Sequence, residues 1–241
     1  MDFSKRSRES ELMDNPEVSQ QTLENVLRDI NRANRILGGN RATIKALSQL
    51  VSQNPRDSYT VLDMGCGDGA MLREVVLFFR RIGKNVKCLG IDLNGNALRM
   101  AREASLDFPE ITYLKKDILD SDASGLECDM LITTLTLHHF YDEEIPAILK
   151  RFGKLARIGI VINDLQRSPL AYSLFKVFSL IFIHTAMAKN DGLVSIARGF
   201  TKAELTQFSK GILGVEHKII WQWAFRYVWI IKMNRLTRTY E

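Results

Sequence analysis

The sequence predicts an α/β protein with a doubly wound, mostly parallel sheet of seven strands that ends in an antiparallel hairpin. Short apolar or β-branched runs alternate with stretches of helical periodicity between residues 60 and 162, which is the pattern of consecutive β–α–β units. Three glycines follow the first of these runs directly, at residues 65–69. Two later runs, residues 217–223 and 227–233, are separated by only three residues, and this spacing favours an antiparallel pair over a crossover.

The predicted elements follow one another in a regular order. Residues 19–52 have helical periodicity and are interrupted at residues 38–40, which predicts two helices ahead of the sheet. The parallel strands are expected at residues 60–62, 86–91, 111–114, 128–135 and 158–162. Helices are expected between them, most clearly at residues 70–81 and 96–105, where apolar side chains recur at helical spacing.

This order divides the chain into two parts. Residues 1–56 are expected to form a helical cap segment, and residues 57–241 to form the domain that contains the sheet. A lid is expected as an insertion at about residues 166–200, because residues 169–187 would form a helix that is apolar nearly all round. Lys176 near the middle of that helix argues against a membrane span, so we expect it to cover an apolar pocket, with contact to a membrane surface as the alternative.

The glycine-rich turn predicts a nucleoside-binding site. Gly65, Gly67 and Gly69 allow the backbone to turn tightly and to approach a ligand closely, and the helix that follows presents free N–H groups. Asp92 ends the second strand, where its carboxylate can accept hydrogen bonds from ribose hydroxyls, unless it only caps the next helix.

The charge beside this turn separates two candidate ligands. Written as Gly65-x-Gly67-x-x-Ala70, the turn also fits a dinucleotide fingerprint. Asp63 and Asp68 oppose that interpretation, because two carboxylates would repel a pyrophosphate. The same carboxylates would attract a ligand that carries a sulfonium and an α-amino group.

The pattern Asp63-x-Gly65-x-Gly67-x-Gly69 resembles the first motif of class I S-adenosylmethionine-dependent methyltransferases, and the resemblance covers roughly residues 57–235. It implies S-adenosyl-L-methionine as the cofactor. In the family, the acid corresponding to Asp117 meets the adenine amino group and the backbone after it lies on the ring edge. The cofactor-binding residues implied by the resemblance are Asp63, Gly65, Cys66, Gly67, Gly69, Asp92, Leu93, Asp117, Ile118 and Thr133.

Two adjacent histidines are the candidate catalytic residues. Residues 137–140 resemble the His-His segment of many small-molecule methyltransferases. Because imidazole titrates near neutral pH, it suits a general base that takes a proton from a hydroxyl. We expect His139 to be this base, with Asp164 at the end of the fifth strand as its partner or alternative, while His138 packs on the cofactor. Purely structural roles for both histidines are the alternative.

Composition and charge narrow the possible macromolecular partners. The net charge of +5 and the isoelectric point near 9.1 raise nucleic acid as a partner, and the basic excess lies near the C-terminal end, where it includes Arg235 and Arg238. A final hairpin with one face on the core explains this segment more simply, so no nucleic-acid partner is expected.

The cysteines bear on metal binding and on the compartment. Cys66, Cys88 and Cys128 have neither the number nor the spacing of a disulfide framework or a metal site, and no metal is expected. Residues 1–11 are dense in charge and lack the apolar core of a signal peptide. We therefore expect the protein in a reducing cytoplasm.

Two segments beside the predicted sheet add a narrower resemblance. Residues 34–41 and 163–170 are similar to segments of bacterial methyltransferases that accompany type III polyketide synthases, and residues 191–200 fit the same pattern. This resemblance implies O-methylation of a small lipophilic acceptor, phenolic or polyketide-like. C-methylation of a quinone-like ring, dinucleotide binding and a non-catalytic methyltransferase-like module are the alternatives.

Overall fold

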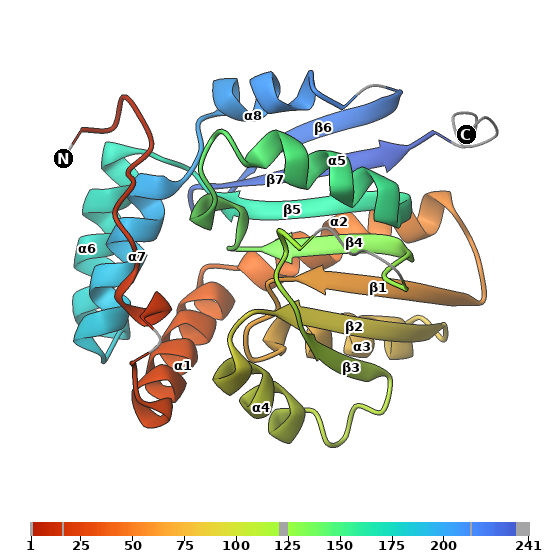
Figure 1. Ribbon diagram of the computed structural model, residues 1–241, viewed down its shortest axis with the longest axis horizontal. Coiled ribbons are helices and arrows are strands. Elements are labelled where there is room, and N and C mark those ends of the chain that lie inside the picture. Colours follow the sequence, from red (N-terminus) through yellow and green to blue (C-terminus); the bar gives the residue numbers. More distant parts are fainter. Residues whose placement is uncertain (1, 16, 121–124, 213, 235–241) are drawn as a thin grey trace.

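The computed structural model describes residues 2–15, 17–120, 125–212 and 214–234, and a seven-stranded sheet forms its centre (Figure 1). The strands are β1 (Ser58–Met64), β2 (Asn85–Asp92), β3 (Ile111–Lys115), β4 (Cys128–Thr134), β5 (Ala156–Leu165), β6 (Val215–Gln222) and β7 (Arg226–Met233). Their order is β3-β2-β1-β4-β5-β7-β6, parallel from β3 to β5, with β7 antiparallel to both β5 and β6. The predicted fold class is confirmed. Arg235 and Arg238 of the predicted basic segment lie outside the described residues.

Helices cover both faces of the sheet. On one face, α2 (Gly39–Gln53) and α3 (Ala70–Arg81) pack into a common core with β1 and β2. On the other face, α5 (Ile145–Leu155) and α8 (Lys202–Ser209) pack against the opposite side chains of the strands. The helix α4 (Gly95–Ala104) lies along β2 and β3. Strands buried on both faces account for the continuous apolar runs in the sequence.

A third group of helices lies beyond the carboxyl ends of β1, β4 and β5 (Figure 1). It consists of α1 (Gln20–Ile36), α6 (Pro169–Phe182) and α7 (Ala186–Arg198). The N-terminal segment, residues 2–15, runs across this group and contains the short 3-10 helix η1 (Leu12–Asp14). Because ligands of doubly wound sheets bind outside the carboxyl ends of the strands, these helices enclose the expected site.

The apolar stretch predicted as one helix, residues 169–187, forms parts of two helices. The Asp29 carboxylate of α1 accepts hydrogen bonds from the backbone N–H groups of His184 (2.9 Å) and Thr185 (2.7 Å). The Thr185 side chain then caps the first turn of α7. A contact with a distant helix therefore fixes the break, since it satisfies backbone donors that a continuous helix would have used internally.

Two further expectations are refined by the fold. The strand predicted at residues 128–135 ends at Thr134, because Leu135 has a φ of +55°, outside the strand region. The predicted cap segment contains two differently placed helices: α1 faces the expected site, whereas α2 packs on the sheet beside α3. Within the described residues, no helix has both the length and the apolar character that crossing a membrane requires.

Candidate active site

The glycine-rich turn follows β1 and has the backbone conformation that glycine favours. Gly65, Gly67 and Gly69 have φ values of +80°, +54° and +73°. A Cβ atom on Gly65 would fall 2.3 Å from the Thr136 side chain, and one on Gly69 would fall 2.1 Å from the Tyr113 hydroxyl. A Cβ atom on Gly67 would meet nothing within 4 Å. Neighbouring side chains therefore leave no room for a Cβ atom at Gly65 or Gly69, whereas the Cβ position of Gly67 faces open space.

Two buried carboxyl groups lie beside this turn. Asp63 is fully buried, and its Oδ1 has no hydrogen-bond partner among the described residues. Burial, together with the charge of Asp92, raises the pKa of Asp63 to about 8. The Asp92 carboxylate accepts hydrogen bonds from the N–H groups of Gly67 (2.8 Å) and Asn94 (2.8 Å). Burial raises the pKa of Asp92, and these two hydrogen bonds oppose the rise.

A cavity of about 1020 Å³ opens at the carboxyl ends of the strands. Most of the predicted cofactor residues line it, namely Asp63, Gly65, Cys66, Gly67, Asp92, Leu93, Asp117 and Ile118. Gly69 and Thr133 do not line it: Gly69 packs against Tyr113, and Thr133 is buried in β4. Thr134 and Thr136 border the cavity instead.

The opposite wall of the cavity is apolar and comes from the third group of helices. The helices α1, α6 and α7 and the residues between them contribute Leu23, Leu27, Ile30, Ala33, Leu37, Ala171, Leu174, Phe175, Phe178, Ile183, Ala188 and Ile196. The helix α6 thus occupies the position expected of the lid. Its outer side exposes Leu170, Val177, Leu180 and Ile181. A helix with apolar residues on both sides explains why the sequence is apolar nearly all round.

The N-terminal segment closes one side of the cavity through polar contacts with residues far along the chain. The Arg6 guanidinium donates to the backbone oxygens of Arg198 (2.7 Å) and His138 (2.9 Å). The Asp191 carboxylate accepts hydrogen bonds from the N–H groups of Leu12 (2.8 Å) and Met13 (2.9 Å). No periodicity or motif in residues 2–15 pointed to this role.

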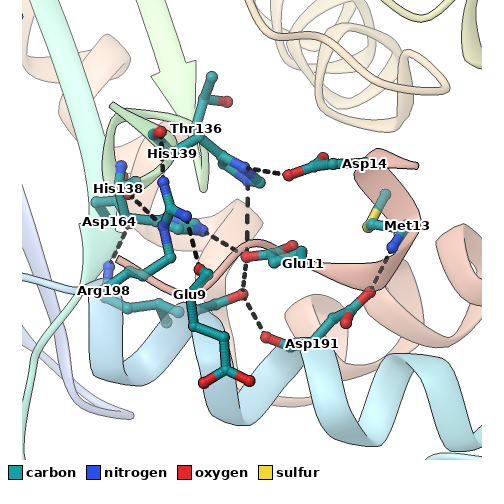
Figure 2. A network of polar contacts seen from close by, with 12 residues as sticks. Glu9, Glu11, Met13, Asp14, Thr136, His138, His139, Asp164, Asp191 and Arg198 are labelled. Atoms are coloured by element: carbon teal, nitrogen blue, oxygen red, sulfur yellow. Dashed lines mark hydrogen bonds and ion pairs between the residues drawn. The ribbon is translucent and has the colours of Figure 1, made fainter. Parts of the chain in front are cut away.

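His138 lies in a buried chain of two carboxylates and one imidazole (Figure 2). Its Nδ1 donates to Asp164 Oδ1 at 2.7 Å, and its Nε2 donates to Glu11 Oε1 at 3.3 Å. Burial alone would lower the pKa of His138, but the two carboxylates outweigh it and raise the pKa to about 9. Burial likewise opposes ionisation of Glu11, yet His138, His139 and the Ser195 hydroxyl lower its pKa to about 2. His138 is therefore a charged donor with no lone pair available to accept a proton.

The predicted pairing of Asp164 with His139 is wrong. Asp164 is buried and is held by His138, whose backbone N–H also donates to its Oδ2 (3.1 Å). Burial opposes ionisation of Asp164, but the charge and hydrogen bonds of His138 lower its pKa. Adjacent residues in the 3-10 helix η2 (Leu137–His139) point in different directions, so only His138 reaches the end of β5.

His139 points into the cavity and pairs with a different acid. Its Nδ1 lies 3.3 Å from Asp14 Oδ2, and its Nε2 lies 3.8 Å from Glu11 Oε1 (Figure 2). The His139 side chain is 28% exposed, against 2% for His138, and the two ring centroids are 4.5 Å apart. Of the two histidines, His139 has the access to the cavity that a base needs.

Glu11, His138 and His139 also form a group with the composition of a metal site. Their ligand atoms lie within 4.8 Å of one another. Both nitrogens of His138 already donate to carboxylates, however, and a metal ligand must be a neutral imidazole with a free lone pair. We therefore interpret the group as a hydrogen-bonded ion cluster that fixes the N-terminal segment to η2.

Comparisons with known proteins find similarity to methyltransferases. Residues 61–159 match the methyltransferase-domain family. The plantazolicin methyltransferase BpumL in complex with SAH superposes with a TM-score of 0.66 at 16% identity, covering 92% of this chain and 93% of that one. Human N-acetylserotonin methyltransferase in complex with SAM superposes with a TM-score of 0.64 at 16% identity, covering 90% of this chain and 57% of that one.

Curated relatives match shorter stretches of sequence. The uncharacterized methyltransferase Rv0089 of Mycobacterium tuberculosis is 28% identical over 106 residues, which are 44% of this chain and 49% of that protein. Pyochelin synthetase PchF of Pseudomonas aeruginosa is 27% identical over 135 residues, 52% of this chain and 7% of that protein. The chain thus spans about half the length of one relative and a small part of the other.

The fold is a Rossmann-like α/β fold that is similar to those of solved methyltransferases. The match to the methyltransferase-domain family covers the part of this fold from β1 to β5.

Proposed function

We propose that this chain is an S-adenosylmethionine-dependent methyltransferase that O-methylates a small, lipophilic, phenolic or polyketide-like acceptor. One observation carries the proposal: the glycine-rich turn, the unpartnered Asp63 carboxyl and the His139 imidazole border the same cavity, whose other wall is apolar. The methyltransferase domain and the solved structures of similar fold, which hold SAM or SAH, support the choice of cofactor.

The residues at the turn fit that cofactor. The unpartnered Oδ1 of Asp63 suits an α-ammonium group, and Gly67 leaves room for a ligand against its backbone. Asp92 is assigned to the ribose, and Asp117 with the backbone of Ile118 to the adenine, since all three line the cavity. When bound, S-adenosyl-L-methionine supplies a methyl group activated on a sulfonium.

His139 is the proposed general base. A hydrogen bond from Nδ1 to Asp14 leaves Nε2 as the proton acceptor, in the way that a carboxylate selects one tautomer of a catalytic histidine. The apolar side chains of α1, α6 and α7 hold the acceptor and exclude water, so that positioning contributes to the rate as well.

The outer side of α6 supports a further contact. Leu170, Val177, Leu180 and Ile181 are exposed on a helix that also lines the cavity. We propose that this side touches a membrane surface, from which a lipophilic acceptor can enter. Cosedimentation with phospholipid vesicles measures the contact, and recovery of the protein in the supernatant at every lipid concentration would exclude it.

Ligand-dependent thermal shifts test the cofactor assignment. S-adenosylmethionine and S-adenosylhomocysteine should raise the melting temperature, because they bind the native state, whereas NAD and NADP should not. Stabilisation by a dinucleotide without any effect of S-adenosylhomocysteine would overturn the assignment. Labelled cofactor and a panel of alkylated phenols then test the transfer itself. A product methylated on ring carbon would replace O-methylation by C-methylation.

A further inference from the structure

Arg226 is a buried cation that faces the cavity. It opens β7, it is only 3% exposed, and it lines the cavity. Its Nε and Nη1 atoms are buried, and neither makes a hydrogen bond within the described residues. A guanidinium has five N–H donors in a planar fork, and leaving them unpaired away from water is costly. The proposed reaction makes no use of this group.

The nearest acid does not satisfy Arg226. Asp164 stabilises the charged guanidinium from a distance, while burial lowers the pKa of Arg226 to about 10, so that it remains charged at neutral pH. Both carboxylate oxygens of Asp164 are engaged elsewhere. Oδ1 accepts from His138 Nδ1 and from the N–H of Leu165, and Oδ2 accepts from the N–H of His138. Among the residues that the structure describes, none forms an ion pair with Arg226.

The surroundings of Arg226 bring the guanidinium to the cavity. A Cβ atom on Gly39 would lie 2.8 Å from Arg226 Cζ, so the absence of a side chain at Gly39 allows α2 to begin against the guanidinium. Asn34, which also lines the cavity, has a buried Oδ1 without a partner, while its Nδ2 donates to Asn40. Polar groups of both kinds, donors and an acceptor, thus lack partners at this end of the cavity.

We propose that Arg226 binds a carboxylate carried by the acceptor, so that the acceptor is a lipophilic organic acid rather than a neutral phenol. A carboxylate matches the fork of a guanidinium in two parallel hydrogen bonds, which are stronger than hydrogen bonds between neutral groups. The apolar walls from α1, α6 and α7 receive the rest of such a molecule. This identity of the acceptor rests on the proposed methyl transfer.

The α-carboxylate of the cofactor has the same chemistry, and the sheet order favours the acceptor as its source. Two strands, β4 and β5, separate β1, which carries the glycine-rich turn, from β7, which carries Arg226. At about 4.8 Å between neighbouring strands, the backbones of β1 and β7 are roughly 14 Å apart. An α-carboxylate lies close to the α-ammonium assigned to Asp63, at the β1 side of the cavity.

Matched ligands test the proposal on the full chain in the presence of S-adenosylhomocysteine. An alkylated para-hydroxybenzoic acid series and its primary amides differ only in charge and in one hydrogen-bonding group. Calorimetry should show the acids binding about tenfold more tightly, or more, because a charge-assisted pair replaces a neutral contact. In Arg226→Met this preference should disappear, and Arg226→Lys should recover part of it. Equal affinities in the wild type, or no binding of any acid, would overturn the proposal without relying on a variant.

Two further comparisons show whether the carboxylate belongs to the cofactor or to the acceptor. They also separate the proposal for Arg226 from the proposed methyl transfer. If Arg226→Met weakens S-adenosylhomocysteine but not methylthioadenosine, which lacks the amino-acid part, the carboxylate belongs to the cofactor and the acceptor assignment is wrong. Unchanged affinity for both nucleosides supports the acceptor. If the protein binds the acids more tightly than the amides but binds neither S-adenosylhomocysteine nor methylthioadenosine, the Arg226 site is supported and the proposed methyl transfer is refuted.

Discussion

The two ends of the cavity are built in different ways. The end assigned to the cofactor comes from one short stretch, residues 63–69, together with Asp92, Asp117 and Ile118 at the ends of the next two strands. The opposite end comes from residues 2–15, from α1, α6 and α7, and from the turn before β7. A site made by consecutive residues can be identified from sequence. A site made by segments from different parts of the chain becomes visible only when the fold brings them together.

The two ends also differ in charge. Within the described residues, Asp63 Oδ1 at the cofactor end and Arg226 Nε and Nη1 at the acceptor end are buried without a hydrogen-bond partner. Unlike charges attract strongly where water is excluded. With a pKa of about 8, Asp63 is mostly protonated at neutral pH in the free protein, and an ammonium group bound beside it favours its ionised form. The guanidinium of Arg226 is already charged and suits an anionic acceptor. Each end can be disrupted separately.

The largest effect is expected from closing the cofactor end. In Gly67→Val a side chain enters open space at the turn, so binding of S-adenosylhomocysteine should be abolished while the domain stays folded. Gly83→Val is the matched control, because Gly83 also has a positive φ (+66°) and open space around its Cβ position but lies outside the cavity. Calorimetry and circular dichroism of both variants measure the difference. Undiminished binding by Gly67→Val would separate the turn from the cofactor.

The second-largest effect is expected at His139, which lies where the two ends of the cavity meet. A positioned base contributes about a hundredfold or more, so His139→Gln should lower turnover by that order and leave cofactor affinity unchanged. The loss should shrink as the pH approaches the phenol pKa, near 10 for a tyrosine-like hydroxyl, because the acceptor then ionises unaided. Rates from neutral to alkaline pH measure this.

Asp14→Asn distinguishes orientation of His139 from proton transfer by it. Since Asp14 contacts only Nδ1, its loss should lower turnover less than His139→Gln and with the same pH trend. Wild-type rates in both variants and in the double variant would rule out His139 as the base. Catalysis would then depend on positioning by the apolar wall.

The smallest effect is a pH-dependent change in stability at the acceptor end. The folded-state pKa of His138, about 9, lies above its ordinary 6.5, so its stabilising contribution is complete below about 6.5 and is lost as the pH rises through 9. The folded-state pKa of Glu11, about 2, lies below its ordinary 4.5, so its contribution is present above 4.5 and is lost as the pH falls through 2. Both contributions are complete between about pH 4.5 and 6.5.

Glu11→Gln should therefore melt a few degrees below the wild type in that window, and the difference should shrink towards pH 9. Glu9→Gln is the control, since Glu9 lies in the same segment with an exposed side chain. Melting temperatures measured across the pH range provide the test. A constant difference at all pH values would show that Glu11 stabilises the fold by packing rather than through its charge.

More of the end of the cavity that contains the glycine-rich turn than of the opposite end could be located from the sequence. The succession of strands along the chain, the glycine-rich turn and the position of Asp92 follow from local patterns, because each depends on residues close together in the chain. The pairing of Asp164 with His138 depends on the direction of side chains in a 3-10 helix, which no spacing rule specifies. The Thr185 cap at the start of α7 left a local signal, a threonine before a helix, but its partner Asp29 lies in α1.

The contacts of the N-terminal segment have a consequence for the order in which the molecule can be completed. Arg6 bonds to His138 and Arg198, and Glu11 bonds to His138 and Ser195, partners that lie between 127 and 192 positions later in the chain. During synthesis these early residues emerge long before their partners exist. Contacts of such large sequence separation form late, since the loop that joins them must first be ordered. This early segment is therefore among the last to be fixed in place, and the cavity acquires its final wall only after the sheet has assembled.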